Sequence, residues 1–330
     1  MSEPRVTVLV PTIGRMAYLP AAKLSLASQT WRDYRVRVLD NASPLEARTF
    51  LEQWAAEDDR VTIDRVDERI PMFANFNRGM RAARTELVTF VHDDDVYLPR
   101  YLEVLAGALE ANPGAAFSGS NFDFVDEDGR VIEERRWIRT TELWSGARYV
   151  AELVGRNRNP VPMPGLVFRR RAFGPDGFDE SLPIHFGDFV LLMRAAEEGG
   201  MVACDERVVQ IRKHAAQASA LPLSGSIGMR TELMASYLDE YGARHPAEAP
   251  LVARLRRRVA LAHRVGLVWG WLSSEDPAER AACLEQLGRR PPDAVVRSVL
   301  RWADRRGLRP KQSGARLTRV ARVAAERLRF

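Results

Sequence analysis

The chain has 330 residues, of which 46% are hydrophobic and 28% are charged, a composition typical of a soluble globular protein. This length allows two domains, or one domain with an extension, and no apolar run approaches the roughly 18 residues that a membrane-spanning helix needs. The net charge of +5 is uneven, because residues 289–330 hold 13 Lys or Arg and 3 Asp or Glu. The basic character therefore belongs to this tail and does not indicate nucleic-acid binding by the rest of the chain.

The N-terminal residues and the cysteines indicate where the protein works. The first residues, Met-Ser-Glu-Pro-Arg-Val, lack the charged and then apolar layout of a secretory signal. Cys204 and Cys283 show no metal-binding spacing and fit a reducing compartment. We therefore expect a cytoplasmic protein.

Strand-like and helix-like segments alternate over the first ninety or so residues. We expect strands at 5–10, 35–39, 61–66 and 87–91, and helices at 19–29, 45–56 and 73–84. This alternation favours a mainly parallel sheet with helices on both faces. Ligands of such sheets bind at the carboxyl ends of the strands, which is where Pro11, Thr12, Asp40 and the acidic residues after Val91 fall.

The second half of the chain begins with a more β-like, mixed region. Segments 116–124 and 130–138 flank a turn at 126–129 and predict a hairpin, and later segments predict a strand at 166–168, a helix at 189–196 and a strand at 208–211. From about residue 225 the pattern is helical, with helices expected at 251–272, 278–287 and 314–328. We expect an α/β domain over 1–220 and a helical, basic extension over 221–330.

The segment 87–99 carries the clearest chemical signal in the chain. An apolar strand leads directly into Asp93, Asp94 and Asp95, and like charges at this spacing repel one another. A divalent cation would remove that cost, and carboxylate oxygens suit Mg²⁺ or Mn²⁺. The alternative is an acidic turn that caps a helix beginning near Pro99.

Two common nucleotide-binding signatures are missing from the sequence. No glycine-rich loop ends in Gly-Lys-Ser or Gly-Lys-Thr, and no Gly-x-Gly-x-x-Gly follows the first strand. This excludes a P-loop enzyme and a dinucleotide-binding dehydrogenase.

A series of short motifs, in a fixed order, resembles the family 2 glycosyltransferases, which have the GT-A fold. The resemblance extends from Val6 to about Ser219. Its motifs are Val-Pro-Thr after the first strand, Val-Leu-Asp-Asn-Ala-Ser after the second, Asn-Phe-Asn-Arg-Gly at 75–79, His-Asp-Asp-Asp-Val-Tyr-Leu-Pro at 92–99, Gly-Phe-Asp-Glu-Ser-Leu at 177–182, and Gly-Asp at 187–188. Their order and spacing, more than any single motif, carry the similarity.

The resemblance implies a site for a nucleoside-diphosphate sugar. The residues implied in this site are Pro11, Thr12, Asp40, Arg69, Asn77 and Asp93. Asp40 would accept a hydrogen bond from the base, typically uracil, and Arg69 would meet the diphosphate. The alternatives are an Asx turn or helix cap at Asp40 and a solvated arginine at Arg69.

The resemblance also implies a metal site and a catalytic base. The metal ligands would be Asp94, Asp95 and His214, with His92 standing where the family's Asp-x-Asp-Asp motif has its first Asp. Asp188 matches the position of the general base, although a Gly-Asp pair before an apolar helix is also an ordinary N-cap.

Together these features predict an inverting, metal-dependent glycosyltransferase. It would use a nucleoside-diphosphate sugar, with a UDP-sugar favoured, and a sugar, lipid-linked or small-molecule hydroxyl acceptor, in the synthesis of cell-surface polysaccharide or another glycoconjugate. The alternatives are a sugar-phosphate nucleotidyltransferase and a non-catalytic protein that binds nucleotide sugars. The basic tail at 289–330 predicts peripheral contact with an anionic membrane, or a helix packed on its own domain.

Overall fold

A computed structural model describes residues 4–156, 159–184, 186–214, 223–274, 276–287, 294, 297–298 and 300–302. The chain forms two compact units. The first comprises Met1–Val150 and Asn159–Ser219, and the second comprises Ala151–Arg158 and Ala220–Phe330. The segment 314–328, and most of the tail at 289–330, lie outside the described residues.

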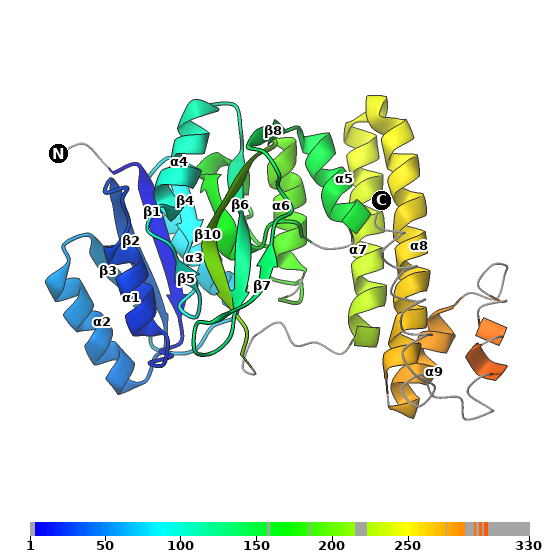
Figure 1. The fold of residues 1–330 in the computed structure, drawn as a ribbon, viewed down its shortest axis with the longest axis horizontal. Coiled ribbons are helices and arrows are strands. Elements are labelled where there is room, and N and C mark those ends of the chain that lie inside the picture. Colours follow the sequence, from blue (N-terminus) through cyan, green and yellow to red (C-terminus); the bar gives the residue numbers. More distant parts are fainter. Residues whose placement is uncertain are drawn as a thin grey trace. The chain divides into compact units, whose positions relative to one another are not determined.

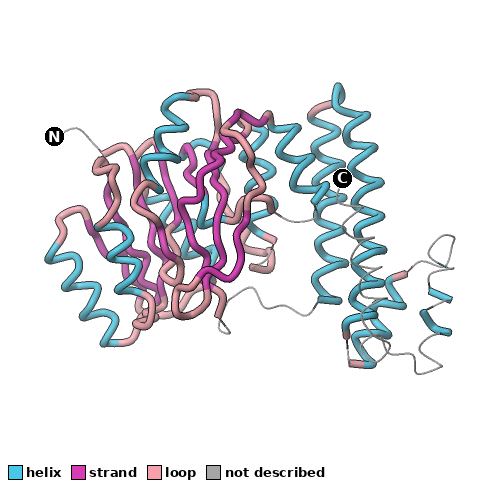
Figure 2. The backbone as a smooth tube through the Cα atoms, in the orientation of Figure 1, coloured by secondary structure: helices cyan, strands magenta, loops and turns pink. Residues whose placement is uncertain are grey.

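The first unit is built on one mixed sheet, which gathers the strands drawn in magenta in Figure 2. Its strands are β1 (Val6–Thr12), β2 (Tyr34–Asn41), β3 (Val61–Val66), β4 (Leu87–Phe90), β5 (Val96–Tyr97), β6 (Phe117–Val125), β7 (Val131–Arg135), β8 (Glu142–Trp144), β9 (Leu166–Arg169) and β10 (Met201–Arg212). They lie in the order β3-β2-β1-β4-β9-β6-β10-β5, with β7 paired to β6 and β8 paired to β10.

Helices alternate with the early strands, as Figure 1 shows. The helices of the first unit are α1 (Leu19–Ala27), α2 (Leu45–Glu57), α3 (Met72–Ala82), α4 (Tyr101–Ala111) and α6 (Gly187–Glu197), with short 3₁₀ turns η1 (Met163–Gly165) and η2 (Arg170–Phe173). α5 (Gly146–Arg156) begins in the first unit and ends in the second.

The strands β3, β2, β1 and β4 are parallel neighbours, as the alternation predicts. Val6, Val8 and Val10 of β1 are fully buried, which fits a central strand covered on both faces. The chain first moves outward from β1 to β3 and then returns to place β4 on the other side of β1. β1 and β4 therefore flank a switch point, the position where sheets of this kind bind ligands.

The other half of the sheet is partly antiparallel. β9 runs antiparallel to both β4 and β6, whereas β10 is parallel to β6. The predicted hairpin is confirmed as β6 and β7 with a turn at 126–129. β10 begins at Met201, earlier than the expected strand at 208–211. The sequence pattern missed its first half because the pairing register shifts between Cys204 and Val209, and the charged residues there hide the alternation of apolar and polar residues.

The second unit is helical where the structure describes it. It contains α7 (Leu223–Arg244), η3 (Pro246–Glu248), α8 (Ala249–Ser273) and α9 (Pro277–Gln286). A small apolar cluster that includes Leu267, Trp271 and Leu284 packs α8 against α9. None of the described helices combines the length and the apolar character that would let it cross a membrane.

Gly200, just before β10, gives a test of this packing. Its φ is 72°, and a Cβ at this position would lie 2.1 Å from the carbonyl oxygen of Trp144. Gly200→Ala should lower the free energy of unfolding by about 2–4 kcal/mol in urea denaturation, because it adds both backbone strain and a clash with main-chain atoms. Gly107→Ala is the control, because Gly107 lies in α4 and its added Cβ would meet no heavy atom within 4 Å apart from its chain neighbours and the backbone of its own helix. Equal stability of the two variants would contradict this account.

Candidate functional site

Polar side chains at the carboxyl ends of β1, β2 and β4 gather around a cavity of about 570 Å³. The residues that line it are Pro11, Thr12, Ile13, Arg15, Asn41, Arg69, Ile70, Met72, Phe73, Asn75, Phe76, His92, Asp93, Asp94, Asp95, Pro162, Met163, Pro164, Phe178, Ile184, Asp188 and Ile211. A cavity of this size at a switch point is the expected place for a small-molecule ligand.

Asp93 ties the end of β4 to the end of β1. Its carboxylate is completely buried, and it accepts a hydrogen bond of 2.5 Å from the Thr12 hydroxyl and another from the Arg15 guanidinium. Burial raises the pKa of Asp93, and the attraction of Arg15 offsets only part of this rise. Asp93 therefore holds the two strand ends together while its negative charge is only partly compensated.

Asp94 lies at the centre of the charged cluster. Its Oδ2 atom is 2.9 Å from Nη1 of Arg15 and 3.0 Å from Nε2 of His214. Although burial acts to raise the pKa of Asp94, His92, Arg15 and the hydrogen bond from His214 together hold it below its usual value. Asp94 is therefore the carboxylate of this cluster that is best prepared to carry a negative charge.

Asp95 faces β10 and the histidine that precedes the cluster. Its Oδ1 atom accepts a 2.9 Å hydrogen bond from the Arg212 backbone N–H, and its Oδ2 atom lies 3.8 Å from Nδ1 of His92. Burial, together with the neighbouring charge of Asp94, raises the pKa of Asp95 well above its usual value. A further positive charge beside Asp95 would relieve this penalty.

The cluster fits a divalent cation. His92, Asp94 and Asp95 each offer a ligand atom, and these atoms lie within 4.8 Å of one another. Nε2 of His92 is buried without a hydrogen-bond partner among the described residues. Burial also lowers the pKa of His92, which favours the neutral imidazole that binds metals. His214, predicted as a ligand, contacts Asp94 and so lies beside this group.

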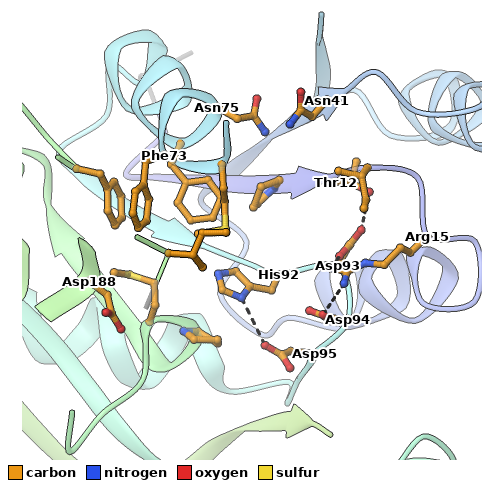
Figure 3. Close-up of a pocket in the computed structure, with 18 of the residues that line it drawn as sticks. Thr12, Arg15, Asn41, Phe73, Asn75, His92, Asp93, Asp94, Asp95 and Asp188 are labelled. Carbon is orange, nitrogen blue, oxygen red and sulfur yellow. Dashed lines mark hydrogen bonds and ion pairs between the residues drawn. The ribbon is translucent and has the colours of Figure 1, made fainter. Parts of the chain in front are cut away.

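Asp188 lies across the cavity from Arg15 and Asp93, as Figure 3 shows. The N-cap of α6 is Phe186, so Asp188 occupies the first turn and does not cap the helix. Its Oδ1 atom accepts a 2.9 Å hydrogen bond from the Phe189 N–H. Burial raises the pKa of Asp188 to about 7, although the Phe189 N–H and the Asn159 side chain both favour the ionised form. A carboxylate with this pKa is suited to accept a proton near neutral pH.

Aromatic rings form the wall of the cavity beside Asp188. Phe73 and Phe178 stack with their centroids 5.0 Å apart and their planes at 9°. Gly187 allows this arrangement, because a Cβ there would lie 2.2 Å from the Phe73 ring. The base candidate follows Gly187 directly and lines the same cavity as these rings, so apolar surroundings agree with the direction of its pKa shift.

At the end of β2, the side chain that lines the cavity is Asn41 and not Asp40. Asp40 is completely buried and accepts hydrogen bonds from the Ser43 N–H, at 3.0 Å, and from Nε of Arg65, at 2.7 Å. The Asn41 amide exchanges two 2.9 Å hydrogen bonds with the backbone of Ile70. Adjacent side chains of a strand point to opposite faces, so the two residues have different surroundings.

The structure brings some of the other predicted residues to the cavity and not others. Pro11 and the exposed Arg69 line it. Asn77 does not line it, because its amide exchanges two 2.8 Å hydrogen bonds with the backbone of Phe178 and also donates to Glu180. Asn77 thus fixes the loop that carries an aromatic wall residue.

Sequence reasoning missed Arg15 as a site residue and treated His92 only as a departure from a motif. The structure places both in the charged cluster. For His92 a signal was present, because a histidine directly before three carboxylates is a plausible metal ligand in its own right. For Arg15 no local pattern exists, since its partners are more than seventy residues away.

Comparisons with known proteins agree with this geometry. The family model described as glycosyl transferase family 2 matches residues 7–174. The chain is 30% identical over 138 residues to the GalNAc(5)-diNAcBac-PP-undecaprenol beta-1,3-glucosyltransferase of Campylobacter jejuni. The aligned region covers 40% of this chain and 42% of that protein. It is 26% identical over 136 residues to an uncharacterized glycosyltransferase of Methanocaldococcus jannaschii, and this aligned region covers 41% of this chain and 47% of that protein. The chain thus spans less than half the length of these relatives.

Solved structures show the same fold. TarS of Staphylococcus aureus, in complex with UDP-GlcNAc, is similar with a TM-score of 0.66 and 14% identity, over 92% of this chain and 88% of that one. A mannosyltransferase of Pyrobaculum calidifontis, in complex with GDP-Man and Mn²⁺, gives a TM-score of 0.52 and 16% identity, over 95% and 89% of the two chains. The predicted α/β GT-A fold is confirmed, and because the family model covers half of its length, the chain belongs to glycosyl transferase family 2.

Proposed function

We propose that the protein transfers a sugar from a nucleoside diphosphate to a hydroxyl group, with inversion at the anomeric carbon. One observation carries this proposal: an acidic cluster and a separate carboxylate, Asp188, line opposite parts of one cavity of about 570 Å³. This arrangement provides one end for a diphosphate leaving group and another for an acceptor. UDP-sugars are the favoured donors in the proposal, and TarS, whose fold is similar, was solved with UDP-GlcNAc.

The donor end is formed by β1, β4 and the residues after β10. Asp94 and Asp95, with His92 and His214 beside them, would hold Mg²⁺ or Mn²⁺. The bound cation would stabilise the negative charge that develops on the departing diphosphate. Arg69, an exposed residue that lines the cavity, would add a further positive charge for the diphosphate.

Pro11, Thr12 and Asn41 would border the nucleoside. Pro11 and Asn41 line the cavity at the ends of β1 and β2, and the Thr12 hydroxyl positions Asp93. Asp40 does not line the cavity, so it would affect binding of the base indirectly. Its carboxylate accepts a hydrogen bond from the Ser43 N–H and so fixes the turn that follows Asn41. Asn77 would act on the donor only indirectly, because its amide is bonded to the loop at Phe178.

At the acceptor end, Asp188 would take the proton of the attacking hydroxyl. Among the described residues that line the cavity, it is the one carboxylate outside the acidic cluster. A single displacement needs one base and no covalent nucleophile, so it inverts the anomeric centre. A nucleotidyltransferase or a non-catalytic binding protein would not need a carboxylate with a raised pKa at this end.

The proposal extends to a lipid-linked acceptor in cell-surface polysaccharide or glycoconjugate synthesis. The name of the C. jejuni relative describes an undecaprenol-linked acceptor, and the 13 basic residues of segment 289–330 would favour contact with an anionic membrane. A cytoplasmic location rests on the two cysteines, which are both free and buried.

Removal of the central carboxylate tests the metal role. Asp94→Ala should abolish sugar transfer and weaken nucleotide-sugar binding, because the diphosphate then loses its counter-charge. Transfer would be measured with a panel of nucleotide sugars, first ranked by thermal shift in the presence of Mn²⁺. Asp128→Ala, which removes an exposed carboxylate from the β6–β7 turn, is the control. Full activity in excess chelator would show that the cluster is only an acidic turn.

Asp188→Asn tests the base. Asn keeps the size and the hydrogen bond to the Phe189 N–H but takes no proton, so kcat should fall by roughly 10² to 10⁴ while donor affinity hardly changes. Because the pKa of Asp188 is about 7, wild-type kcat/KM should rise with pH and level off above that value. Loss of donor affinity with an unchanged kcat would make Asp188 a donor ligand.

The same variant should reveal the cost of the partly buried carboxylate. The folded-state pKa of about 7 lies above the ordinary 3.8, so folding favours the protonated form and wild-type stability falls as the pH rises between these values. Asp188→Asn avoids this loss. Its stability relative to wild type should increase by on the order of 2 kcal/mol from pH 5 to pH 8 in urea denaturation. A constant difference across this range would show that Asp188 ionises freely.

A further inference from the structure

Arg15 is a cation built into the acidic cluster. Its guanidinium contacts Asp93 through Nη2 and Asp94 through Nη1, the latter at 2.9 Å. Among the described residues, these contacts make it the one Lys or Arg side chain that forms ion pairs with the cluster. Arg212 lies nearby, but its guanidinium donates to carbonyl oxygens, including the 3.0 Å hydrogen bond to the Asp94 backbone.

The backbone of this arginine is fixed, whereas its side chain is only partly enclosed. The Gly14 N–H donates a 2.9 Å hydrogen bond to the Thr12 hydroxyl oxygen, and a Cβ on Gly14 would lie 2.8 Å from Ala47. The Arg15 carbonyl accepts the first N–H bonds of α1. In contrast, 29% of the side chain is exposed, and its Nε, although buried, has no hydrogen-bond partner among the described residues. The guanidinium can therefore leave the cluster while the loop stays in place.

Arg15 and a metal ion would have to share one carboxylate. Asp94 Oδ2 already receives Arg15 at 2.9 Å and His214 at 3.0 Å, and Asp94 also belongs to the group of side chains that fits a cation. A guanidinium and a divalent cation on the same carboxylate repel each other, so each weakens the binding of the other. The positive charge of Arg15 also lowers the net negative charge that attracts the metal.

We propose that, in the free enzyme, Arg15 competes with the metal ion for Asp94. The metal then binds weakly until the guanidinium leaves, and an incoming diphosphate offers the guanidinium another negative partner. Bound donor consequently raises the affinity of the protein for the metal ion, and bound metal raises its affinity for the donor. This inference rests on the proposed metal-dependent function, because it assigns a role to Arg15 at that same site.

The test is the Mn²⁺ affinity of the full chain without nucleotide, measured from the free-Mn²⁺ signal in electron paramagnetic resonance. Arg15→Gln removes the competing charge and should tighten Mn²⁺ binding by about tenfold or more, the usual worth of a charged hydrogen bond. Arg15→Lys keeps the charge but loses the forked geometry, so its affinity should lie between the two. Thermal unfolding of each variant shows whether it is folded under the conditions of the titration.

Arg69→Gln is the matched control. It removes one positive charge from the same cavity, and among the described residues Arg69 makes no ion pair with the acidic cluster. If Arg15 competes directly, Arg69→Gln should leave the Mn²⁺ affinity of the free protein within about twofold of wild type, because an exposed charge is screened by water and salt.

The outcomes separate this inference from the proposed function. Tighter Mn²⁺ binding in Arg15→Gln, but not in Arg69→Gln, supports competition. Equal or weaker binding in Arg15→Gln, with Mn²⁺ still bound by wild type, overturns the role of Arg15 and leaves the metal site intact. If neither wild type nor Arg15→Gln binds Mn²⁺, with UDP present or absent, the metal role itself is wrong and this inference fails with it.

Discussion

The crowding of carboxylates at the end of β4 is the constraint on which the rest of the site depends. Asp93 and Asp95 are buried, and burial of an ionised carboxylate is costly unless other groups compensate it. The compensating groups come from distant segments: Thr12 is the last residue of β1, Arg15 lies in the loop after it, and the Arg212 N–H belongs to the last residue of β10. The acidic residues thereby hold together strand ends that would otherwise meet only through backbone pairing.

The topology of the sheet makes this compensation available. The order of the strands in the sheet reverses at β1, so β4 lies parallel to β1 and the loop after β1 lies over the end of β4. The short β5, directly after the cluster, pairs antiparallel with β10 and carries the cluster toward the end of that strand. His214 then reaches Asp94 although it lies 120 residues further along the chain. The polar site and the two halves of the mixed sheet are therefore one structural unit.

The sequence was sufficient for the features that depend on local pattern. Alternating strands and helices predicted β1 to β4, and three consecutive Asp residues predicted the cluster. Features set by long-range pairing were beyond it: the antiparallel insertion of β9 between β4 and β6 has no local signal. The choice between Asp40 and Asn41 depends on which face of β2 meets the cavity, and one residue of strand register decides this.

The two carboxylates with proposed chemical roles show how surroundings divide those roles. Burial acts to raise the pKa of both Asp94 and Asp188. At Asp94, the effects of His92, Arg15 and the His214 hydrogen bond prevail and lower the pKa, so this carboxylate is prepared to remain charged beside a cation. At Asp188 the polar neighbours are two backbone N–H groups and the Asn159 amide, burial prevails, and the pKa rises to about 7. Groups of the same chemical type thus acquire separate ligand and base properties because only one of them has cationic partners.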